Sequence, residues 1–311
     1  MEIIEERVLI HGEVKLGATI SRPNDDTKHP LVLLIMGTGK TDRDGNQKGF
    51  KSNIYKNLSD MFVNMGYICI RYDKRGTHAS SGSFKKAGLS DLVNDSANVI
   101  EYAKSLPYVD ENRIIACGHS EGAMIATLLT KQENLDSIIL LGGATLCLKS
   151  AMEFQNYQTI DELTQKKGFL GWYISKLINK EKVKKQLTAV FEKAQKAKGD
   201  TFFYRGAFLP TKWLKEHGQL TDEDFIKMIE TYNGQVLAIT GKCDLQADYS
   251  SLDRIAEFEN VTTYTPDNVN HILREIDDNN SYLSVQKQYK RLARNPIHKA
   301  TQDKIEEFLE K

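Results

Sequence analysis

A serine at position 120 has a sequence setting that could make its hydroxyl a nucleophile. It is the central residue of a G-x-S-x-G pattern at residues 118–122. The apolar segment 113–117 predicts a strand that ends just before this pattern, and the small-residue segment 122–130 predicts a helix directly after it. A sharp strand-to-helix turn exposes the serine oxygen above the strand end, and flanking glycines leave room for that turn. The alternative is a serine that only caps the helix.

Such a serine needs a general base and a carboxylate to orient that base, in the chain order Ser, acid, His for this kind of turn. Asp244 follows the apolar segment 235–240 and is the favoured acid, with Asp248 as its nearby competitor. Of seven histidines, His271 follows the last predicted strand and is the favoured base, whereas His298 stands close to the terminal helix. His119 is interpreted as part of the wall of the turn.

Two backbone N–H groups are predicted to bind a developing oxyanion. Glu121 would offer its N–H at the start of a helix, where such groups lack an intrahelical partner. The second donor is predicted on the loop after segment 31–36, and Thr38 is the chosen residue. Gly39-Lys40-Thr41 in this loop also suggests a phosphate-binding loop, but that motif requires glycine at the position of Leu34, which lies inside the strand.

The elements that would place these residues alternate between strands and helices. Apolar runs predict strands and amphipathic runs predict helices, and the strands are 31–36, 67–72, 113–117, 137–141, 235–240 and 261–264, with helices at 54–65, 89–105, 122–130 and 302–309. This order is typical of a doubly wound, mostly parallel sheet. Segments 8–11 and 16–21 predict an antiparallel hairpin before it.

The middle of the chain has a different pattern. Residues 146–231 contain Lys-rich helical stretches and no buried-strand signal. We expect one core domain made of residues 1–145 and 232–311, split by a helical insertion at 146–231. Aromatic residues of the insertion could line a pocket, and they are Phe169, Trp172, Tyr173, Phe202, Phe203, Phe208 and Trp213.

The composition of the chain argues against several classes of protein. Lys plus Arg and Asp plus Glu both number 42, so the chain lacks the basic excess of a nucleic-acid or anionic-membrane binder. No signal peptide or membrane-length apolar run is visible, and no Asp, Glu, His or Cys cluster has metal-ligand spacing. Four widely spaced cysteines include Cys69 and Cys117 in predicted strands. We expect a cytosolic protein without metal or cofactor; its oligomeric state, including a homo-oligomer, is left open.

Taken together, these segments resemble the bacterial α/β-hydrolase esterases whose first loop reads approximately GSGPTDRDGN. The corresponding loop here is Gly37–Asn46. The further matches are Arg71-Tyr72-Asp73-Lys74-Arg75-Gly76, Gly118-His119-Ser120-Glu121-Gly122, Gly241-Lys242-Cys243-Asp244-Leu245-Gln246 and Asn270-His271. The chain departs from the family at Lys40, where proline is common, and at Thr77-His78, where another glycine usually follows. Acyl or alcohol preference is therefore not transferred.

The resemblance implies an α/β-hydrolase fold in which the insertion is a helical cap over the site. It also implies a Ser120–Asp244–His271 triad, an oxyanion hole from the Thr38 and Glu121 N–H groups, and small-molecule esters of short acyl groups as substrates. An amidase or peptidase, or an acyltransferase, could use the same three residues. A non-enzymatic binding protein on this scaffold is a further alternative, disfavoured because all three residues are present.

Overall fold

The centre of the protein is an eight-stranded, mostly parallel sheet. The computed structural model describes residues 2–165, 178–277 and 279–310. Its main sheet has the order β1-β2-β6-β3-β7-β8-β11-β12. The strands are β1 (Ile3–His11), β2 (Lys15–Pro23), β3 (His29–Ile35), β6 (Ile68–Tyr72), β7 (Val109–His119), β8 (Ser137–Leu141), β11 (Gln235–Ile239) and β12 (Val261–Tyr264). β2 runs antiparallel to β1 and β6, and the other pairs are parallel. The predicted hairpin and parallel sheet are confirmed.

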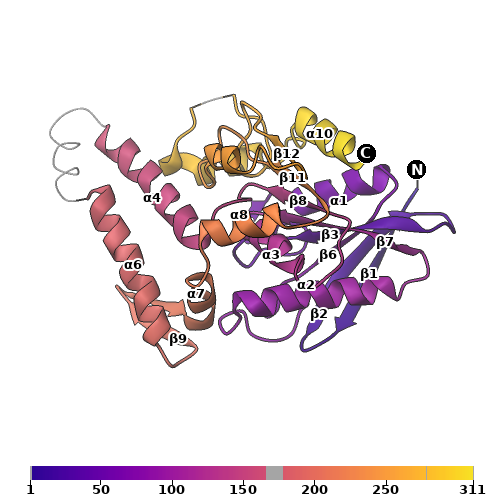
Figure 1. Cartoon of the computed structure of the whole chain (residues 1–311), viewed down its shortest axis with the longest axis horizontal. Coiled ribbons are helices and arrows are strands. Elements are labelled where there is room, and N and C mark those ends of the chain that lie inside the picture. Colours follow the sequence, from indigo (N-terminus) through magenta and orange to yellow (C-terminus); the bar gives the residue numbers. More distant parts are fainter. Residues whose placement is uncertain (1, 166–177, 278, 311) are drawn as a thin grey trace.

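Helices cover both faces of this sheet and make a three-layer molecule (Figure 1). The covering helices are α1 (Ile54–Asn64), α9 (Val285–Leu292) and α10 (Lys299–Leu309) on one face, and α2 (Leu89–Lys104) and α3 (Glu121–Leu129) on the other. The apolar run of β3 is continuous because both faces of this strand are buried. Leu31, Leu33 and Ile35 belong to the apolar cluster on the side of α2 and α3, whereas Val32 and Leu34 belong to the cluster on the side of α1.

The parallel strands bring distant loops to one edge of the sheet. β3, β7, β11 and β12 all point the same way, so the loops after their carboxyl ends lie together. These are the loops that carry Thr38, Ser120, Asp244 and His271. The sheet therefore assembles residues that are as much as 233 positions apart, from 38 to 271.

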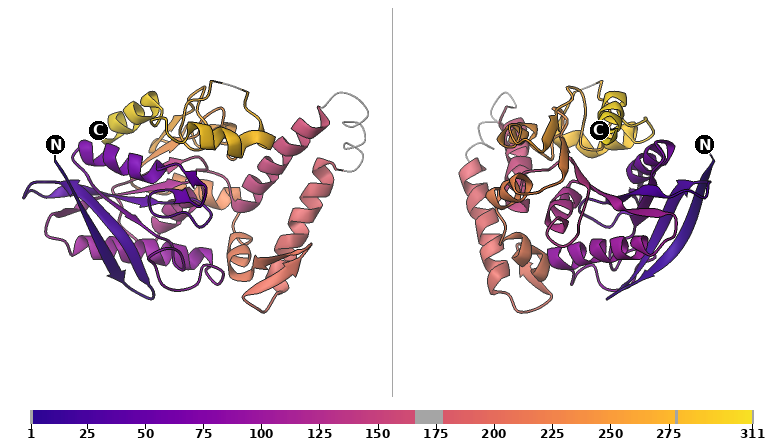
Figure 2. Two further views of the ribbon diagram at one scale, coloured as in Figure 1. Left: turned by 180° about the vertical axis from the view of Figure 1, so that it is seen from behind. Right: turned by 45° about the vertical axis from the view of Figure 1, so that its right-hand side comes forward.

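The segment between β8 and β11 projects away from the sheet. Its described elements are α4 (Leu148–Thr164), α6 (Lys180–Lys196), β9 (Thr201–Tyr204), β10 (Ala207–Pro210), α7 (Thr211–His217) and α8 (Asp222–Glu230). Figures 1 and 2 show α4 and α6 on the side of the molecule opposite β1. The segment has an apolar cluster of its own, to which α4, α6 and α7 contribute. The antiparallel pair β9–β10 within it was not predicted from the sequence.

The aromatic residues proposed to line a pocket have different surroundings. Phe169, Trp172 and Tyr173 lie outside the described residues. Phe203 and Phe208 face each other across β9–β10 and are 54% and 72% exposed. Phe202 is buried in the apolar cluster of the segment. Only Trp213, among the described members of this set, lines the cavity that contains Ser120.

The smaller elements complete the chain. They are β4 (Asn46–Gln47), β5 (Phe50–Lys51) and the 3-10 helices η1 (Tyr249–Arg254) and η2 (Tyr282–Ser284). All four cysteines are free thiols, and Cys69 and Cys117 are buried in their strands as predicted. Across the described ranges, no helix has both the length and the apolar character needed to cross a membrane.

Candidate active site

Ser120 lies in a tight turn between β7 and α3. Its backbone has φ 57° and ψ −122°, a region that residues with a side chain rarely occupy. The flanking glycines have no room for a side chain, because a Cβ at Gly118 would lie 2.0 Å from the carbonyl oxygen of Gly122. A Cβ at Gly122 would lie 2.0 Å from the carbonyl oxygen of Ile35. The strand, turn and helix predicted around Ser120 are thus present, with a physical need for both glycines.

Ser120 and His271 line one cavity of about 400 Å³ at the carboxyl edge of the sheet. Thr38 and Trp213 line the same cavity, so the loop after β3 and helix α7 both reach it. Gly37 packs directly on the serine, since a Cβ there would lie 3.4 Å from Ser120 Oγ. Ser120 and His271 are not hydrogen-bonded to each other in this structure; such catalytic hydrogen bonds often form fully only when substrate binds.

Asp244 orients His271. Asp244 Oδ2 lies 2.8 Å from His271 Nδ1, and both side chains are buried. The other carboxylate oxygen accepts the backbone N–H groups of Gln246 at 2.7 Å and Ala247 at 3.0 Å. These bonds fix the carboxylate, so Nδ1 of His271 carries the proton and Nε2 is left as the basic nitrogen.

Asp248 and His298, the other candidates for the acid and the base, have different partners. Asp248 caps η1 by accepting the backbone N–H of Ser250 at 3.0 Å. His298 is the N-cap residue of α10, and its Nδ1 lies 3.0 Å from Thr301 Oγ1. Of the acids and bases considered from the sequence, Asp244 and His271 are the pair that the structure brings together.

The two predicted oxyanion donors lie on either side of Ser120. Glu121 is the first residue of α3, and Thr38 follows β3 on the loop that contacts the serine. Neither backbone N–H has a hydrogen-bond acceptor within the part of the chain that the structure describes. The neighbouring Gly37 N–H is different, because it donates to the hydroxyl oxygen of Tyr55 at 2.8 Å. Thr38 and Glu121 therefore have free N–H groups beside the nucleophile.

His119 joins the loop after β3 to the loop of His271. Burial lowers the pKa of His119 to about 3, as does the neighbouring His271, so the ring is neutral at neutral pH. Its Nε2 donates to the carbonyl oxygen of His271 at 2.8 Å, and its Nδ1 accepts the Tyr55 hydroxyl at 3.1 Å. With the bond from Gly37 to Tyr55, one continuous chain of hydrogen bonds crosses the site. Tyr55 was missed from the sequence because it looked like an ordinary buried helix position.

The side chain of Glu121 is buried and ionised. Burial alone would raise its pKa, but the ammonium group of Lys74 and hydrogen bonds from His217 and Trp213 lower it to about 2. Lys74 Nζ lies 3.2 Å from Glu121 Oε2, and both side chains are nearly inaccessible to solvent. The sequence had suggested a role only for the Glu121 backbone; Lys74 appeared there as one residue of a motif.

Other charged residues near the site form ion pairs that join neighbouring segments. Arg43 Nη2 lies 2.6 Å from Asp73 Oδ2, which joins the loop after β3 to the loop after β6. Arg71 Nε lies 2.6 Å from Asp44 Oδ1. These pairs position the loops around the site and leave their charges away from the Ser120 cavity, whose described lining residues include no Asp, Glu, Lys or Arg.

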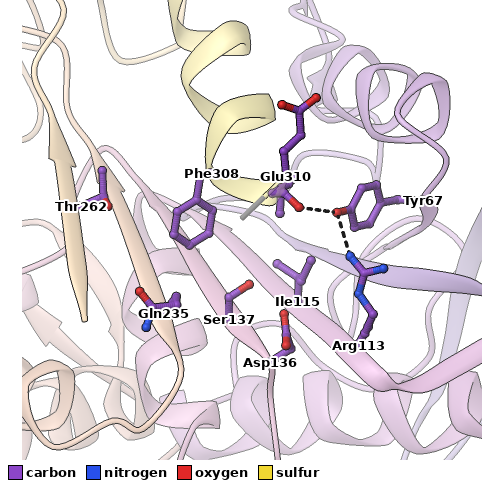
Figure 3. A pocket seen from close by; sticks show the side chains of 10 residues that line it. Tyr67, Arg113, Ile115, Asp136, Ser137, Gln235, Thr262, Phe308 and Glu310 are labelled. Atoms are coloured by element: carbon purple, nitrogen blue, oxygen red, sulfur yellow. Dashed lines mark hydrogen bonds between the residues drawn. The ribbon is translucent and has the colours of Figure 1, made fainter. Parts of the chain in front are cut away.

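Two further cavities bear on the site. A mainly apolar cavity of about 100 Å³ shares Thr38 and Trp213 with the main cavity. Its other lining residues are Phe84, Ala87, Leu92, Pro210 and the paired Lys74 and Glu121. A polar cavity of about 620 Å³ lies between α10 and the amino ends of β8 and β11, opposite the catalytic edge (Figure 3). The 620 Å³ cavity is thus remote from Ser120.

Among the described residues, no group of three or more His, Cys, Asp or Glu side chains could hold a metal ion.

The sheet order, the turn at Ser120 and the buried Asp–His pair define an α/β-hydrolase fold. A family model described as X-Pro dipeptidyl-peptidase (S15 family) matches residues 11–250. Because this match covers most of the chain, the protein belongs to that family. The matched range includes Ser120 and Asp244 and ends before His271.

Two relatives are similar to this chain over part of their length. Esterase EstD of Thermotoga maritima is 23% identical over 151 residues, which cover 49% of this chain and 35% of the relative. Quorum-quenching protein AidA of Acinetobacter baumannii is 28% identical over 112 residues, covering 36% of this chain and 34% of the relative. The chain therefore spans about a third of the length of these relatives.

Solved structures extend the similarity of the fold to nearly the whole chain. Est1E of Butyrivibrio proteoclasticus with bound ferulic acid covers 93% of this chain and 99% of its own, with 20% identity and a TM-score of 0.58. Esterase Pf2001 of Pyrococcus furiosus covers 99% of this chain and 92% of its own, with 12% identity and a TM-score of 0.56. At these identities, the comparison supports the fold.

Proposed function

We propose that this protein is a serine esterase that hydrolyses neutral carboxylic esters of short acyl groups through an acyl-enzyme. The observation that carries the proposal is the shared cavity, which holds Ser120 beside a histidine whose Nδ1 is fixed 2.8 Å from a buried carboxylate. The names of EstD and of Pf2001 agree with an esterase.

The proposed reaction has two halves. In the first, Nε2 of His271 takes the hydroxyl proton of Ser120 as Oγ attacks the ester carbonyl, and the same proton then passes to the departing alcohol. In the second, His271 takes a proton from water, hydroxide attacks the acyl-enzyme, and the proton returns to Ser120 Oγ as the acid leaves. Asp244 stabilises the imidazolium ion that forms in each half. The Thr38 and Glu121 N–H groups would bind the oxyanion, each contributing about 3 kcal/mol.

The lining of the cavity supports a neutral substrate. No Asp, Glu, Lys or Arg is among its described lining residues, and the polar groups there are hydroxyls, amides, the Trp213 indole and the rings of His119 and His271. The S15 family description suggests a second candidate, cleavage of a dipeptide from a peptide chain. A peptide with a free amino terminus carries an ammonium group, whose burial without a carboxylate is costly. The lining therefore favours an ester over such a peptide.

The position and size of the small apolar cavity are evidence that the acyl group is short. It begins at Thr38, one of the two proposed oxyanion donors, and excludes His271, which must face the leaving alcohol. Its volume is about 100 Å³, which is smaller than the roughly 150 Å³ of an engineered cavity that binds benzene. A chain of a few carbons would therefore fill this cavity.

Labelling with a fluorophosphonate tests the nucleophile. The native chain should react with one probe per molecule, and Ser120→Ala should not react. Ser105→Ala removes an exposed hydroxyl at the end of α2 and is the matched control that keeps full labelling. Undiminished labelling of Ser120→Ala would refute the assignment. Kinetics on matched esters and amides, with and without an added alcohol acceptor, would then separate the esterase from a peptidase or an acyltransferase.

A further inference from the structure

The Lys74–Glu121 pair contacts the peptide groups of both proposed oxyanion donors. Lys74 Nζ donates to the carbonyl oxygen of Gly37 and lies 3.2 Å from the carboxylate of Glu121. The Gly37 carbonyl and the Thr38 N–H belong to one peptide unit. The Glu121 carboxylate belongs to the residue that supplies the other N–H. One buried ammonium group therefore bridges both sides of the site.

Because the peptide bond is planar, the contact between Lys74 and the Gly37 oxygen also orients the Thr38 N–H. In a trans peptide, C=O and N–H lie in one plane and point in opposite directions. Holding the Gly37 oxygen on Lys74 therefore directs the Thr38 N–H away from Lys74, and Thr38 lines the cavity of Ser120. Tyr55 holds the Gly37 N–H at 2.8 Å, so the residue before Thr38 is fixed on both of its backbone groups.

Helix α7 holds the other oxygen of the same carboxylate. Trp213 Nε1 donates to Glu121 Oε1 at 2.5 Å, and His217 Nε2 donates to the same oxygen at 3.2 Å. Glu216 of α7 accepts the backbone N–H of Ser90 at 2.7 Å, which ties the helix to the start of α2 as well. α7 is therefore anchored to the core at the carboxylate that Lys74 needs.

We propose that Lys74 and Glu121 are positioning residues of the oxyanion hole and that α7 of the inserted segment keeps them in place. The inference rests on the proposed function, since it assigns these residues to the oxyanion of the same reaction. Because the charges of Lys74 and Glu121 cancel, the pair contributes to catalysis by orienting the Thr38 and Glu121 N–H groups. It should therefore stabilise the transition state more than the bound ester.

The test is a double-mutant cycle with Lys74→Met, Glu121→Gln and the combination of both. Each single variant leaves a buried partner without its counterpart and should unfold more easily, whereas the double variant removes both charges and should recover much of the stability. Its kcat should nevertheless stay about 10- to 100-fold below native, because the peptide groups are no longer held.

A transition-state analogue separates positioning from general damage. A short-chain trifluoromethyl ketone forms an oxyanion on the serine, so its inhibition constant should rise by the factor by which kcat/KM falls. The corresponding alcohol, which forms no oxyanion, should bind equally well to both proteins. Lys104→Met with Glu133→Gln removes a pair of the same residue types, 2.8 Å apart, that joins the end of α2 to the segment after α3, and it should leave both constants unchanged.

A milder variant keeps the inference falsifiable if the double variant does not fold. Trp213→Phe keeps an aromatic ring and removes the donor to Glu121, so it should weaken ketone binding several-fold more than alcohol binding. A folded double variant with native kcat, or a Trp213→Phe protein with equal effects on both ligands, would overturn the inference. A native protein that neither hydrolyses esters nor binds the ketone would instead overturn the proposed function.

Discussion

At the scale of single residues, the site is defined by which hydrogen bonds each side chain can make. Asp244 and Asp248 are four positions apart on one loop, and the sequence favoured Asp244 only because it follows the strand more closely. The structure separates them, because Asp244 reaches His271 while Asp248 caps a 3-10 helix. Such a difference depends on the path of the loop and has no signature in residue type.

Asp244→Asn should abolish most of the activity while the fold persists. An amide at this position would favour the wrong tautomer of His271, and the comparable change in a serine protease costs roughly 10⁴-fold in kcat. Asp248→Asn is the matched control and should retain native kcat. Steady-state kinetics on a short-chain ester measures both. Equal losses in the two variants, or none in Asp244→Asn, would contradict the assignment of the acid.

His119 should make the protein less stable in acid. Its pKa is lowered from 6.5 to about 3 by burial, so the folded state binds fewer protons than the unfolded state between these values. The stability it contributes is therefore complete above about pH 6.5 and is lost as pH falls toward 3, with a slope of up to about 1.4 kcal/mol per pH unit. Urea unfolding at several pH values in this range gives the free energy of unfolding at each pH. This free energy should depend more steeply on pH for the native protein than for His119→Asn. The same pH dependence in both proteins would contradict this account.

At the scale of elements, the sequence was most informative where an apolar run is long or a turn has a strict steric requirement. The strands of the sheet and the turn at Ser120 were predicted because burial on both faces and the flanking glycines leave clear patterns. The pair β9–β10 and helix α9 were not predicted, because they are short and only partly buried. Their structure depends on what packs against them, which a local pattern does not contain.

The turn should tolerate no side chain at Gly122. A methyl group there would lie 2.0 Å from a backbone oxygen of β3, whereas one at Gly199 would lie 3.4 Å from its nearest neighbour. Gly122→Ala should therefore lower the free energy of unfolding by about 1–3 kcal/mol or more, with loss of activity. Gly199→Ala should change neither. Denaturant unfolding checks both, and a Gly122→Ala protein as stable as Gly199→Ala would show that the turn can relax.

At the scale of the whole molecule, the site lies where the sheet and the inserted segment meet. The core supplies Ser120, Asp244 and His271, and the insertion supplies Trp213 to both cavities of the site. The sequence indicated that residues 146–231 differ from the core, but the contact of α7 with Glu121 could not be foreseen. A buried glutamate next to the nucleophile looks in the sequence like any charged residue at a helix start.

Filling the small apolar cavity should shorten the preferred acyl chain. Ala87 lines it and is buried, so Ala87→Leu would occupy much of its volume of about 100 Å³. The ratio of kcat/KM for butyryl over acetyl esters should fall at least about tenfold, in line with the 10–200-fold that a methylene can be worth in such pockets. Ala151→Leu, in the main cavity only, should leave this ratio near native. A ratio that shifts equally in both variants would place the acyl group elsewhere.

The most direct test of the account is to trap the covalent intermediate. The protein should be mixed with excess 4-nitrophenyl butyrate, quenched in acid within the first turnovers, and analysed by intact-mass and peptide-mass measurement. The account predicts one butyryl group per molecule, on the peptide that contains residue 120, and none in Ser120→Ala. A butyryl group on another residue, or undiminished ester hydrolysis by Ser120→Ala, would contradict the central claim.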